Sequence, residues 1–185
     1  FDIVVSVFAL LVTLPLMLVI SILIKLTSPG PVFFRQRRVG SNNEAFNLYK
    51  FRSMVVQTAE VTDRKWTTQD DPRITKIGAF IRKTNLDELP QFWNVIIGNM
   101  SVVGPRPERE HFVEEFKRYI RDYKVRHLVK SGITGWAQVN GFRGETKKNG
   151  SMGKRVEHDI WYIENWSLLL DIRIIFMTIW NMIKG

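Results

Sequence analysis

The sequence predicts an α+β domain that is mostly helical, contains short strands and associates with a membrane through its first segment. No charged residue occurs between Ile3 and Ile24, helical periodicity recurs in several later segments, and short alternating runs are bounded by glycine and proline. The chain has 185 residues, of which 45% are hydrophobic and 24% are charged. This composition is sufficient for one compact domain with its own core.

The apolar segment near the N-terminus is long enough to cross a bilayer. As a helix, residues 3–24 would be ~33 Å long, against about 30 Å for the hydrocarbon core. Pro15 lies in the middle of this segment and cannot donate a hydrogen bond to the carbonyl of Leu11, so we expect a kink or a break there. Hydropathy alone favours a bent spanning helix. The alternative is a hairpin that enters and leaves by one face, its released carbonyl satisfied by Thr13 or a neighbour. No basic segment precedes the run, unlike in a signal peptide.

The charge of the chain indicates an anionic partner. Lys and Arg number 27, Asp and Glu number 18, and the formal net charge is +9. This suits nucleic acid, a phospholipid surface or a phosphate-bearing substrate. Arg35, Arg37 and Arg38 follow the apolar segment, which favours its location on the cytoplasmic side. The absence of cysteine excludes disulfides, thiolate catalysis and cysteine-ligated zinc, and the three histidines lack metal-ligand spacing.

Two strands are expected after the proline-rich turn that ends the apolar segment. Residues 32–34 form a short run of valine and phenylalanine. Residues 45–54 alternate apolar and polar side chains over several positions, which predicts a strand with Lys50 and Arg52 on one face. Residues 57–71 have no clear period and are interpreted as a helix and a loop.

Five further segments carry apolar residues at helical spacing and are expected to be helices. They are residues 73–83, 89–97, 108–129, 154–163 and a C-terminal segment that contains residues 171–183. The aromatic residues of the third segment are expected in the core. In the last segment one face is expected to carry Ile172, Ile175, Phe176, Ile179 and Ile183, and another is expected to carry Asp171, Thr178 and Asn181. Trp161, Trp166 and Trp180 suit a membrane interface, with a protein core as the alternative.

Two adjacent carboxylates, Asp87 and Glu88, stand where a helix is expected to begin. Asp87 has helix-start character, and Pro90 is tolerated only in a first turn. The unpaired amide groups of a helix start also attract phosphates. The octapeptide of residues 84–91 alone favours a capping acid beside a salt-bridging neighbour, so the chemistry depends on the rest of the chain.

Two later segments are suited to binding an anion. Pro105 and Pro107 fix the backbone on either side of Arg106, and a clamped arginine is a good ligand for an oxyanion. Residues 132–141 are glycine-rich, which lets a backbone approach a ligand closely. Arg143 follows directly after this segment.

Six ordered motifs together resemble a known family. They are SPGPVFFRQ at residues 28–36, YKFRSM at 49–54, DPR at 71–73, LDELPQ at 86–91, VGPRP at 103–107 and the glycine-rich residues 132–141. Over nearly its whole length the chain resembles the bacterial sugar transferase family, the monotopic phosphoglycosyl transferases that load a sugar-1-phosphate onto a polyprenol phosphate.

The resemblance implies a topology that differs from the one favoured by hydropathy. In that family the apolar helix is a re-entrant hairpin broken at a proline, here Pro15. Residues 1–30 would form this membrane helix, and residues 31–185 a cytoplasmic catalytic domain with membrane-interface helices at its C-terminus. The protein would rest in one leaflet of the bacterial inner membrane and face the cytoplasm. Because the chain begins at Phe1, and related proteins commonly carry further membrane helices upstream, we expect an additional N-terminal half.

The resemblance also implies the reaction and its residues. The substrates would be a UDP-sugar and undecaprenyl phosphate. Asp87, kept ionised by Arg82 and the helix start, would attack the sugar-bearing phosphate and expel UMP, while Glu88 would hold Mg²⁺. Asp159 is a candidate for the metal site or the nucleotide. The remaining candidates for substrate binding are Lys50, Arg52, Arg82, Arg106 with its neighbours Pro105 and Pro107, and Arg143.

The sugar is less well defined than the reaction. The sequence RGET at residues 143–146 looks most like the undecaprenyl-phosphate glucose-1-phosphate transferases of exopolysaccharide or colanic-acid-type synthesis, although Phe142 intervenes between Gly141 and Arg143 where many members read Asn-Gly-Arg. UDP-galactose or an N-acetylated sugar is the alternative. A more remote alternative is a basic, membrane-bound binding module without enzymatic activity. The sequence contains no nucleic-acid-binding signature that would support such a module. The sequence is compatible with an oligomer and does not fix its size.

Overall fold

The computed structural model describes residues 1–56, 71–143 and 151–184. It confirms the predicted mixture of many helices with a few short strands. The described residues divide into unit 1, which comprises Phe1–Arg37 and Asn47–Ile97, and unit 2, which comprises Arg38–Phe46 and Gly98–Gly185. The predicted helix and loop at 57–70 and the motif residues 144–146 lie outside the described part of the chain.

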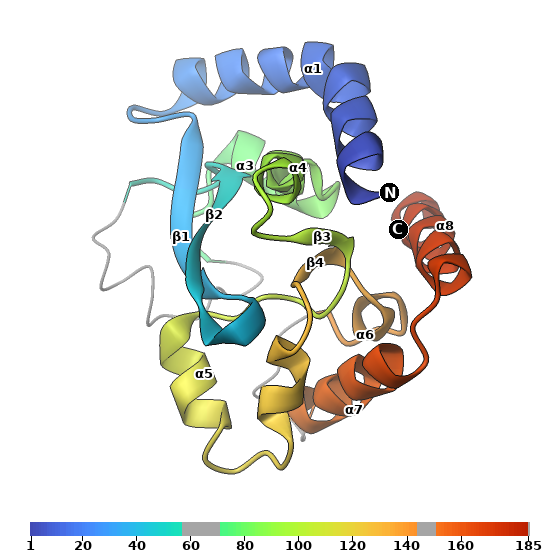
Figure 1. The fold of residues 1–185 in the computed structure, drawn as a ribbon. Helices are drawn as coiled ribbons and strands as arrows, with labels where there is room; N and C mark the ends of the chain where they lie inside the picture. Colours follow the sequence, from blue (N-terminus) through green and yellow to red (C-terminus); the bar gives the residue numbers. More distant parts are fainter. Residues whose placement is uncertain (57–70, 144–150, 185) are drawn as a thin grey trace. The chain divides into compact units, whose positions relative to one another are not determined.

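Unit 1 begins with the long helix α1 (Asp2–Thr27), which contains Pro15. Figure 1 shows that α1 is bent and that its two parts run in different directions. The predicted kink is therefore confirmed, although the helix continues through it. The Thr13 hydroxyl donates to the carbonyl of Ala9 at 2.7 Å. Within the described residues, α1 is the one helix that is long and apolar enough to cross a membrane by length and composition.

The C-terminal half of α1 packs into the core of unit 1. Ile20 and Ile24 contact the buried side chains of Phe51 and Ile81. Phe51 ends β2 (Ala45–Phe51), which pairs with β1 (Phe33–Val39) in a two-stranded sheet across the short η1 turn (Ser41–Asn43). The strand expected at 32–34 thus extends further and includes the basic residues that follow it.

The carboxylate pair lies between two short helices of unit 1. Helix α3 (Lys76–Lys83) begins at Thr75, whose hydroxyl accepts from the amide of Gly78. A Cβ on Gly78 would lie 1.9 Å from the Ser53 carbonyl oxygen, so only glycine allows this close approach of α3 to the end of β2. The 3₁₀ turn η2 (Leu86–Glu88) and helix α4 (Gln91–Ile96) follow.

The expected helix start at Asp87 is wrong in detail. Asp87 lies inside η2, Asn85 precedes that turn in the left-handed conformation with φ of 58°, and Pro90 is the N-cap of α4. The two carboxylates therefore occupy a separate 3₁₀ turn before α4. Asparagine tolerates positive φ better than most residues do, which is how the chain reverses between α3 and η2.

Unit 2 is built around a parallel pair of three-residue strands. Ser101 pairs with Gly132, and Val103 pairs with Thr134. A Cβ on Gly132 would lie 2.1 Å from the amide nitrogen of Gly104, so the glycine-rich segment is used for close strand packing. The elements of this unit are β3 (Ser101–Val103), α5 (Glu110–Phe116), η3 (Tyr123–His127), β4 (Gly132–Thr134), α6 (Trp136–Val139), α7 (Ser151–Glu164) and α8 (Leu168–Lys184).

The single helix expected at 108–129 is wrong. Helix α5 ends at Phe116, and η3 begins only after Asp122, which has a left-handed φ of 57°. The helical spacing of aromatic residues persists across the break, because Phe112, Phe116 and Tyr123 are buried and their rings contact one another. Their predicted place in the core is confirmed, whereas the same prediction for Tyr119 is wrong, because that side chain is 61% exposed. The break is what directs the residues of η3 toward α7.

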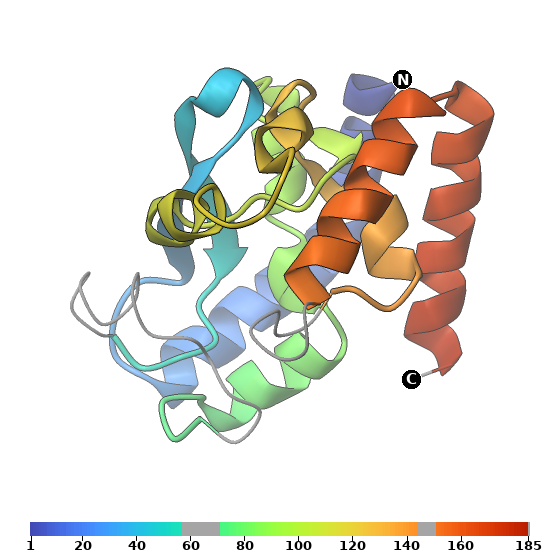
Figure 2. The same ribbon diagram turned by 90° about the horizontal axis from the view of Figure 1, so that it is seen from below.

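Helix α8 packs through Leu170, Asp171 and Ile174 and leaves much of its remaining apolar surface exposed. Figure 2 shows α6 lying against both α7 and α8. The Thr178 hydroxyl lies 2.6 Å from that of Thr134, and the Asn181 amide donates to the carbonyl of Val139 at 3.0 Å. The large apolar side chains left exposed on α8 are those of Leu168, Leu169, Phe176, Ile179, Trp180, Met182 and Ile183. The predicted polar residues Thr178 and Asn181 therefore contact unit 2 and the predicted apolar face is largely exposed, although the packed side also contains Leu170 and Ile174.

His127, which is buried in unit 2, should make the stability depend on pH. Its Nδ1 lies 3.1 Å from the Gly40 carbonyl oxygen, and burial, together with the charge of Arg126, lowers the pKa of the imidazole from 6.5 to about 4. The unfolded chain therefore binds this proton at a higher pH than the folded chain does. The stability contributed by neutral His127, up to about 3 kcal/mol, is complete above pH 6.5 and is lost as the pH falls toward about 4.

The variant His127→Asn isolates this effect, because asparagine keeps a donor for the Gly40 carbonyl and does not titrate. We expect its apparent melting temperature to fall less than that of the wild type between about pH 6.5 and 4. Equal falls in the two proteins would contradict the role of His127.

Candidate active site

Asp87 and Glu88 are buried in unit 1 beside a lysine from β2. Asp87 is 8% exposed and Glu88 is 7% exposed. Nζ of Lys50 lies 2.7 Å from Oε1 of Glu88, in a largely buried ion pair. Two adjacent buried carboxylates on one 3₁₀ turn are more than a solvated capping pair, since charged groups avoid burial unless they are paired. The structure therefore brings together three of the residues predicted from the sequence.

Asn94, which the sequence reasoning missed, holds this arrangement together. The residue is fully buried, its Nδ2 donates to the carbonyl of Asn47 at 2.7 Å, and its Oδ1 accepts from the amide of Tyr49 at 3.0 Å. The side chain thus binds the edge of β2 as another strand would, and it ties α4 to the strand that carries Lys50. The available signal was a polar residue inside the apolar segment 89–97.

Arg52 and Arg82 also belong to unit 1. Nη1 and Nη2 of Arg52 donate to the carbonyls of Pro29 and Ser28 at 2.5 and 2.9 Å, so this buried guanidinium fixes the turn after α1. Burial lowers the pKa of Arg52. Nη1 of Arg82 lies 3.5 Å from the hydroxyl of Ser53. The contacts of Arg52 stabilise the turn after α1. Arg82 belongs to α3, the helix that precedes the carboxylate turn.

The carboxylate turn fits a magnesium ion that is completed by its substrate. No group of three or more His, Cys, Asp or Glu side chains is placed to hold a metal among residues 1–56, 71–143 and 151–184. Mg²⁺ commonly binds through one or two carboxylates together with substrate phosphates. Asp87 and Glu88 supply such hard oxygen ligands, and Lys50 is paired with one of the two carboxylate oxygens of Glu88, Oε1. Glu88 is thus suited to hold Mg²⁺.

The predicted arginine loop lies in unit 2, after β3. Pro105 and Pro107 are buried and Arg106 is half-buried between them. The carbonyl of Arg106 accepts from Nη2 of Arg126 at 2.9 Å, and that of Pro107 accepts from Nη1 of Arg38 at 3.1 Å. The loop is therefore fixed by prolines and by donors to its carbonyls, as the sequence suggested in part.

Arg143 and Asp159 belong to the same unit. Arg143 is half-buried and follows Phe142, whose carbonyl accepts from Nε of Arg155 at 2.7 Å. Asp159 is 2% exposed, and its Oδ2 lies 2.7 Å from Nη2 of Arg126. This places Asp159 in a buried ion pair, which the sequence reasoning did not foresee.

Comparison with known proteins identifies the family. The profile of the family described as "Bacterial sugar transferase" matches residues 1–185. The UDP-glucose:undecaprenyl-phosphate glucose-1-phosphate transferase of Xanthomonas campestris pv. campestris is 51% identical over 177 residues, or 96% of this chain and 37% of the relative. The enzyme of the same name from Escherichia coli (strain K12) is 49% identical over 181 residues, or 97% of this chain and 39% of the relative.

A relative with a different sugar in its name is nearly as similar. The UDP-N-acetylgalactosamine-undecaprenyl-phosphate N-acetylgalactosaminephosphotransferase of Aeromonas hydrophila is 47% identical over 184 residues, or 100% of this chain and 43% of the relative. The chain spans about two fifths of the length of these relatives. The resemblance drawn from the six motifs is confirmed, and the chain belongs to the bacterial sugar transferase family.

Proposed function

We propose that this chain is a phosphoglycosyl transferase that moves a sugar-1-phosphate from a UDP-sugar to undecaprenyl phosphate. The observation that carries the proposal is the buried pair of Asp87 and Glu88, ion-paired to Lys50, in a chain that belongs to the bacterial sugar transferase family. A nucleophile, a site for a divalent ion and a fixed cation are the groups that phosphoryl transfer requires.

The reaction has two displacement steps at one phosphorus atom. A carboxylate oxygen of Asp87 attacks the sugar-bearing phosphorus and forms a new O–P bond. The bond from that phosphorus to the bridging oxygen breaks, and UMP leaves with the electron pair. A phosphate oxygen of undecaprenyl phosphate then attacks the acyl phosphate at the same phosphorus, which releases the lipid-linked sugar diphosphate and regenerates the Asp87 carboxylate.

The other residues bind and neutralise phosphate. Glu88 would hold Mg²⁺, which would supply positive charge against the negative charge of the diphosphate. Lys50 adds a positive charge beside Glu88. Arg82, Arg106 and Arg143 bind diphosphate oxygens, where a guanidinium can make paired charge-assisted hydrogen bonds.

The membrane is the source of the lipid substrate. The exposed apolar side chains of α1 and the outward apolar face of α8 support an association with one leaflet. Trp166 and Trp180 are exposed, as suits an interfacial position. Ile20 and Ile24 are buried in the core of unit 1, so one face of that half of α1 is covered by protein, while Leu18, Ile22 and Leu26 stay exposed. The re-entrant topology and the cytoplasmic orientation are part of this proposal.

Glucose-1-phosphate is the proposed group transferred, with galactose or an N-acetylated sugar as the alternative. The RGET sequence at residues 143–146 and the names of two relatives support glucose, and the name of the third supports an N-acetylated sugar. The deciding assay uses purified protein, undecaprenyl phosphate and Mg²⁺ with a panel of UDP-sugars, scored by UMP release. Release with UDP-glucose alone supports the first choice. No release with any UDP-sugar would refute the activity.

The re-entrant topology predicts that both ends of α1 are cytoplasmic. Because the chain contains no cysteine, Phe1→Cys and Thr27→Cys each create a unique label site. A membrane-impermeant thiol reagent added outside intact cells should label neither variant before lysis and both after it. Arg121→Cys, whose parent side chain is 95% exposed, is the control for an accessible cytoplasmic site. Outside labelling at Phe1→Cys but not at Thr27→Cys would show a spanning helix, which Pro15→Leu should favour.

A further inference from the structure

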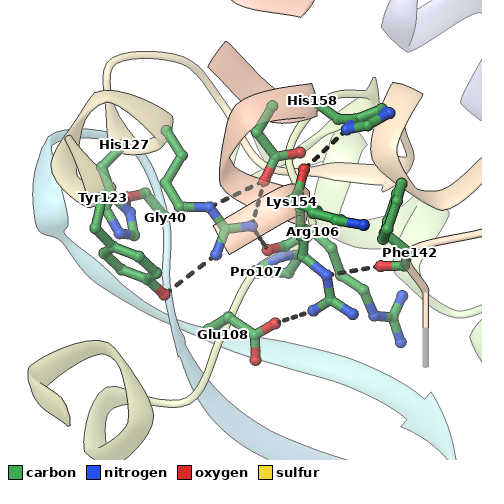
Figure 3. A network of polar contacts seen from close by, with 12 residues as sticks. Gly40, Arg106, Pro107, Glu108, Tyr123, His127, Phe142, Lys154 and His158 are labelled. Atoms are coloured by element: carbon green, nitrogen blue, oxygen red, sulfur yellow. Dashed lines mark hydrogen bonds and ion pairs between the residues drawn. The ribbon is translucent and has the colours of Figure 1, made fainter. Parts of the chain in front are cut away.

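Four charged side chains of unit 2 form a buried ionic network. Nε and Nη2 of Arg126 donate to Oδ2 of Asp159 at 3.1 and 2.7 Å. Nη1 of Arg155 donates to Oε1 of Glu108 at 2.6 Å. All four residues are at most 5% exposed. Figure 3 shows the hydrogen bonds and ion pairs that connect this network to its surroundings.

Both arginines of the buried ionic network also donate to the main chain. Nη2 of Arg126 donates to the carbonyl of Arg106 at 2.9 Å, and Nε of Arg155 donates to the carbonyl of Phe142 at 2.7 Å. The backbone that carries Arg106 and the backbone that leads into Arg143 are therefore held by one set of ion pairs.

Stability alone does not account for this arrangement. Burial raises the pKa of Asp159 against the opposing charges of Arg126 and Arg155, which reflects the desolvation that the carboxylate undergoes. Buried ion pairs can often be replaced by apolar side chains without loss of stability. A planar guanidinium supplies something that an apolar side chain cannot, namely several donors in fixed directions. Arg126 uses Nη1 for a third bond, to the hydroxyl of Tyr123 at 3.1 Å.

We propose that Arg126 and Arg155 are positioning residues, which orient Arg106 and Arg143 for binding the phosphates of the UDP-sugar. Asp159 and Glu108 act by fixing these two arginines. This inference rests on the proposed function, because it assigns the purpose of the network to the same substrate. It gives Asp159 an indirect role in place of a direct contact with the metal or the nucleotide.

The test is a double-mutant cycle in the full protein. Arg126→Lys keeps a positive charge beside Asp159 but loses the planar fork that reaches both Asp159 and the Arg106 carbonyl. We expect kcat/KM for the UDP-sugar to fall about 100-fold, as misplacement of a substrate-binding group can cause. In the Arg106→Ala background the same change should have little further effect, because the side chain that it positions is absent. Arg155→Lys should depend on Arg143→Ala in the same way.

A structural role would give a different pattern. Thr178→Val is the control, because it removes the hydrogen bonds of the Thr178 hydroxyl to Thr134 and to the Ile174 carbonyl at 2.6 and 2.8 Å and leaves Arg126 and Arg155 with their partners, and its effect should be equal in both backgrounds. If Arg126→Lys also lowers kcat/KM by the same factor with and without Arg106, the positioning role is wrong. Should Arg126→Lys fail to fold, Tyr123→Phe removes one bond of Arg126 and should show a smaller loss with the same dependence on Arg106.

Calorimetric binding of UDP-glucose gives the cycle a readout that does not depend on turnover. Arg126→Lys should weaken binding in the wild-type background and not in the Arg106→Ala background. Wild-type protein that releases no UMP would refute the proposed function, while the binding cycle would still decide the positioning role. Active wild-type protein with additive losses would refute the positioning role and leave the proposed function intact.

Discussion

Purified protein mixed with labelled UDP-sugar and Mg²⁺, without undecaprenyl phosphate, is expected to retain sugar-phosphate on the peptide that contains Asp87. The carboxylate is 8% exposed and adjoins Glu88, whose partner Lys50 supplies positive charge at 2.7 Å. In such a site a carboxylate is poorly hydrated and can act as a nucleophile. The adduct is an acyl phosphate, so hydroxylamine should remove the label. UMP should appear in an amount stoichiometric with enzyme before any lipid is added, and steady-state kinetics should be ping-pong.

Variants separate the two carboxylates. Asp87→Asn should abolish both adduct and turnover, because an amide cannot form the O–P bond. Glu88→Gln should raise the Mg²⁺ concentration needed for turnover and lower the rate, since a neutral amide is a weaker ligand for a hard ion. Asp122→Asn is the matched control, because the Asp122 side chain is 60% exposed and lies far from Asp87 and Glu88 in the sequence. This variant should behave as the wild type. A strict requirement for both substrates before UMP appears would favour direct displacement by the lipid and refute the covalent step.

The sequence was sufficient to predict structural features that depend on residues close together in the chain. Pro15 predicted the bend of α1, because the missing amide acts on the same helix. Pro105 and Pro107 predicted a rigid loop around Arg106, because a proline ring fixes the backbone of its own residue. The alternation of residues 45–54 predicted a strand that carries Lys50. The ion pair of Lys50 with Glu88 agrees with the prediction that these two residues belong to one site.

The sequence was insufficient where a side chain finds its partner far along the chain. Arg126 lies in a segment with continuous helical spacing, yet the structure breaks the helix before it and pairs it with Asp159, 33 residues away. Burial of that pair depends on tertiary packing, which periodicity does not encode. Asn94 likewise binds β2 across 47 residues of sequence. The bonds of Arg52 to the carbonyls of Ser28 and Pro29, more than 20 residues earlier in the chain, were likewise not predicted.

Arg82→Ala and Arg106→Ala are each expected to lower kcat/KM for the UDP-sugar by about 100-fold to 1,000-fold while the protein stays folded. Charge-assisted contacts to phosphate matter most when negative charge moves during the displacement, so the loss should appear mainly in kcat. The side chain of Arg106 is half-buried, and the main chain of this residue is fixed by two prolines and by the hydrogen bond from Arg126. Truncation of the Arg106 side chain should therefore change the melting temperature little.

The lysine variants test whether these arginines act through geometry as well as charge. Arg82→Lys and Arg106→Lys should recover only part of the lost kcat/KM, because an ammonium group cannot make the paired hydrogen bonds of a guanidinium with phosphate oxygens. Arg121→Ala removes an arginine whose side chain is 95% exposed and should leave turnover unchanged. Full recovery with lysine would show that charge alone is needed. Near-normal turnover in either alanine variant would remove that arginine from the site, and the diphosphate would then have to be bound by the other arginine together with Lys50 and Arg143.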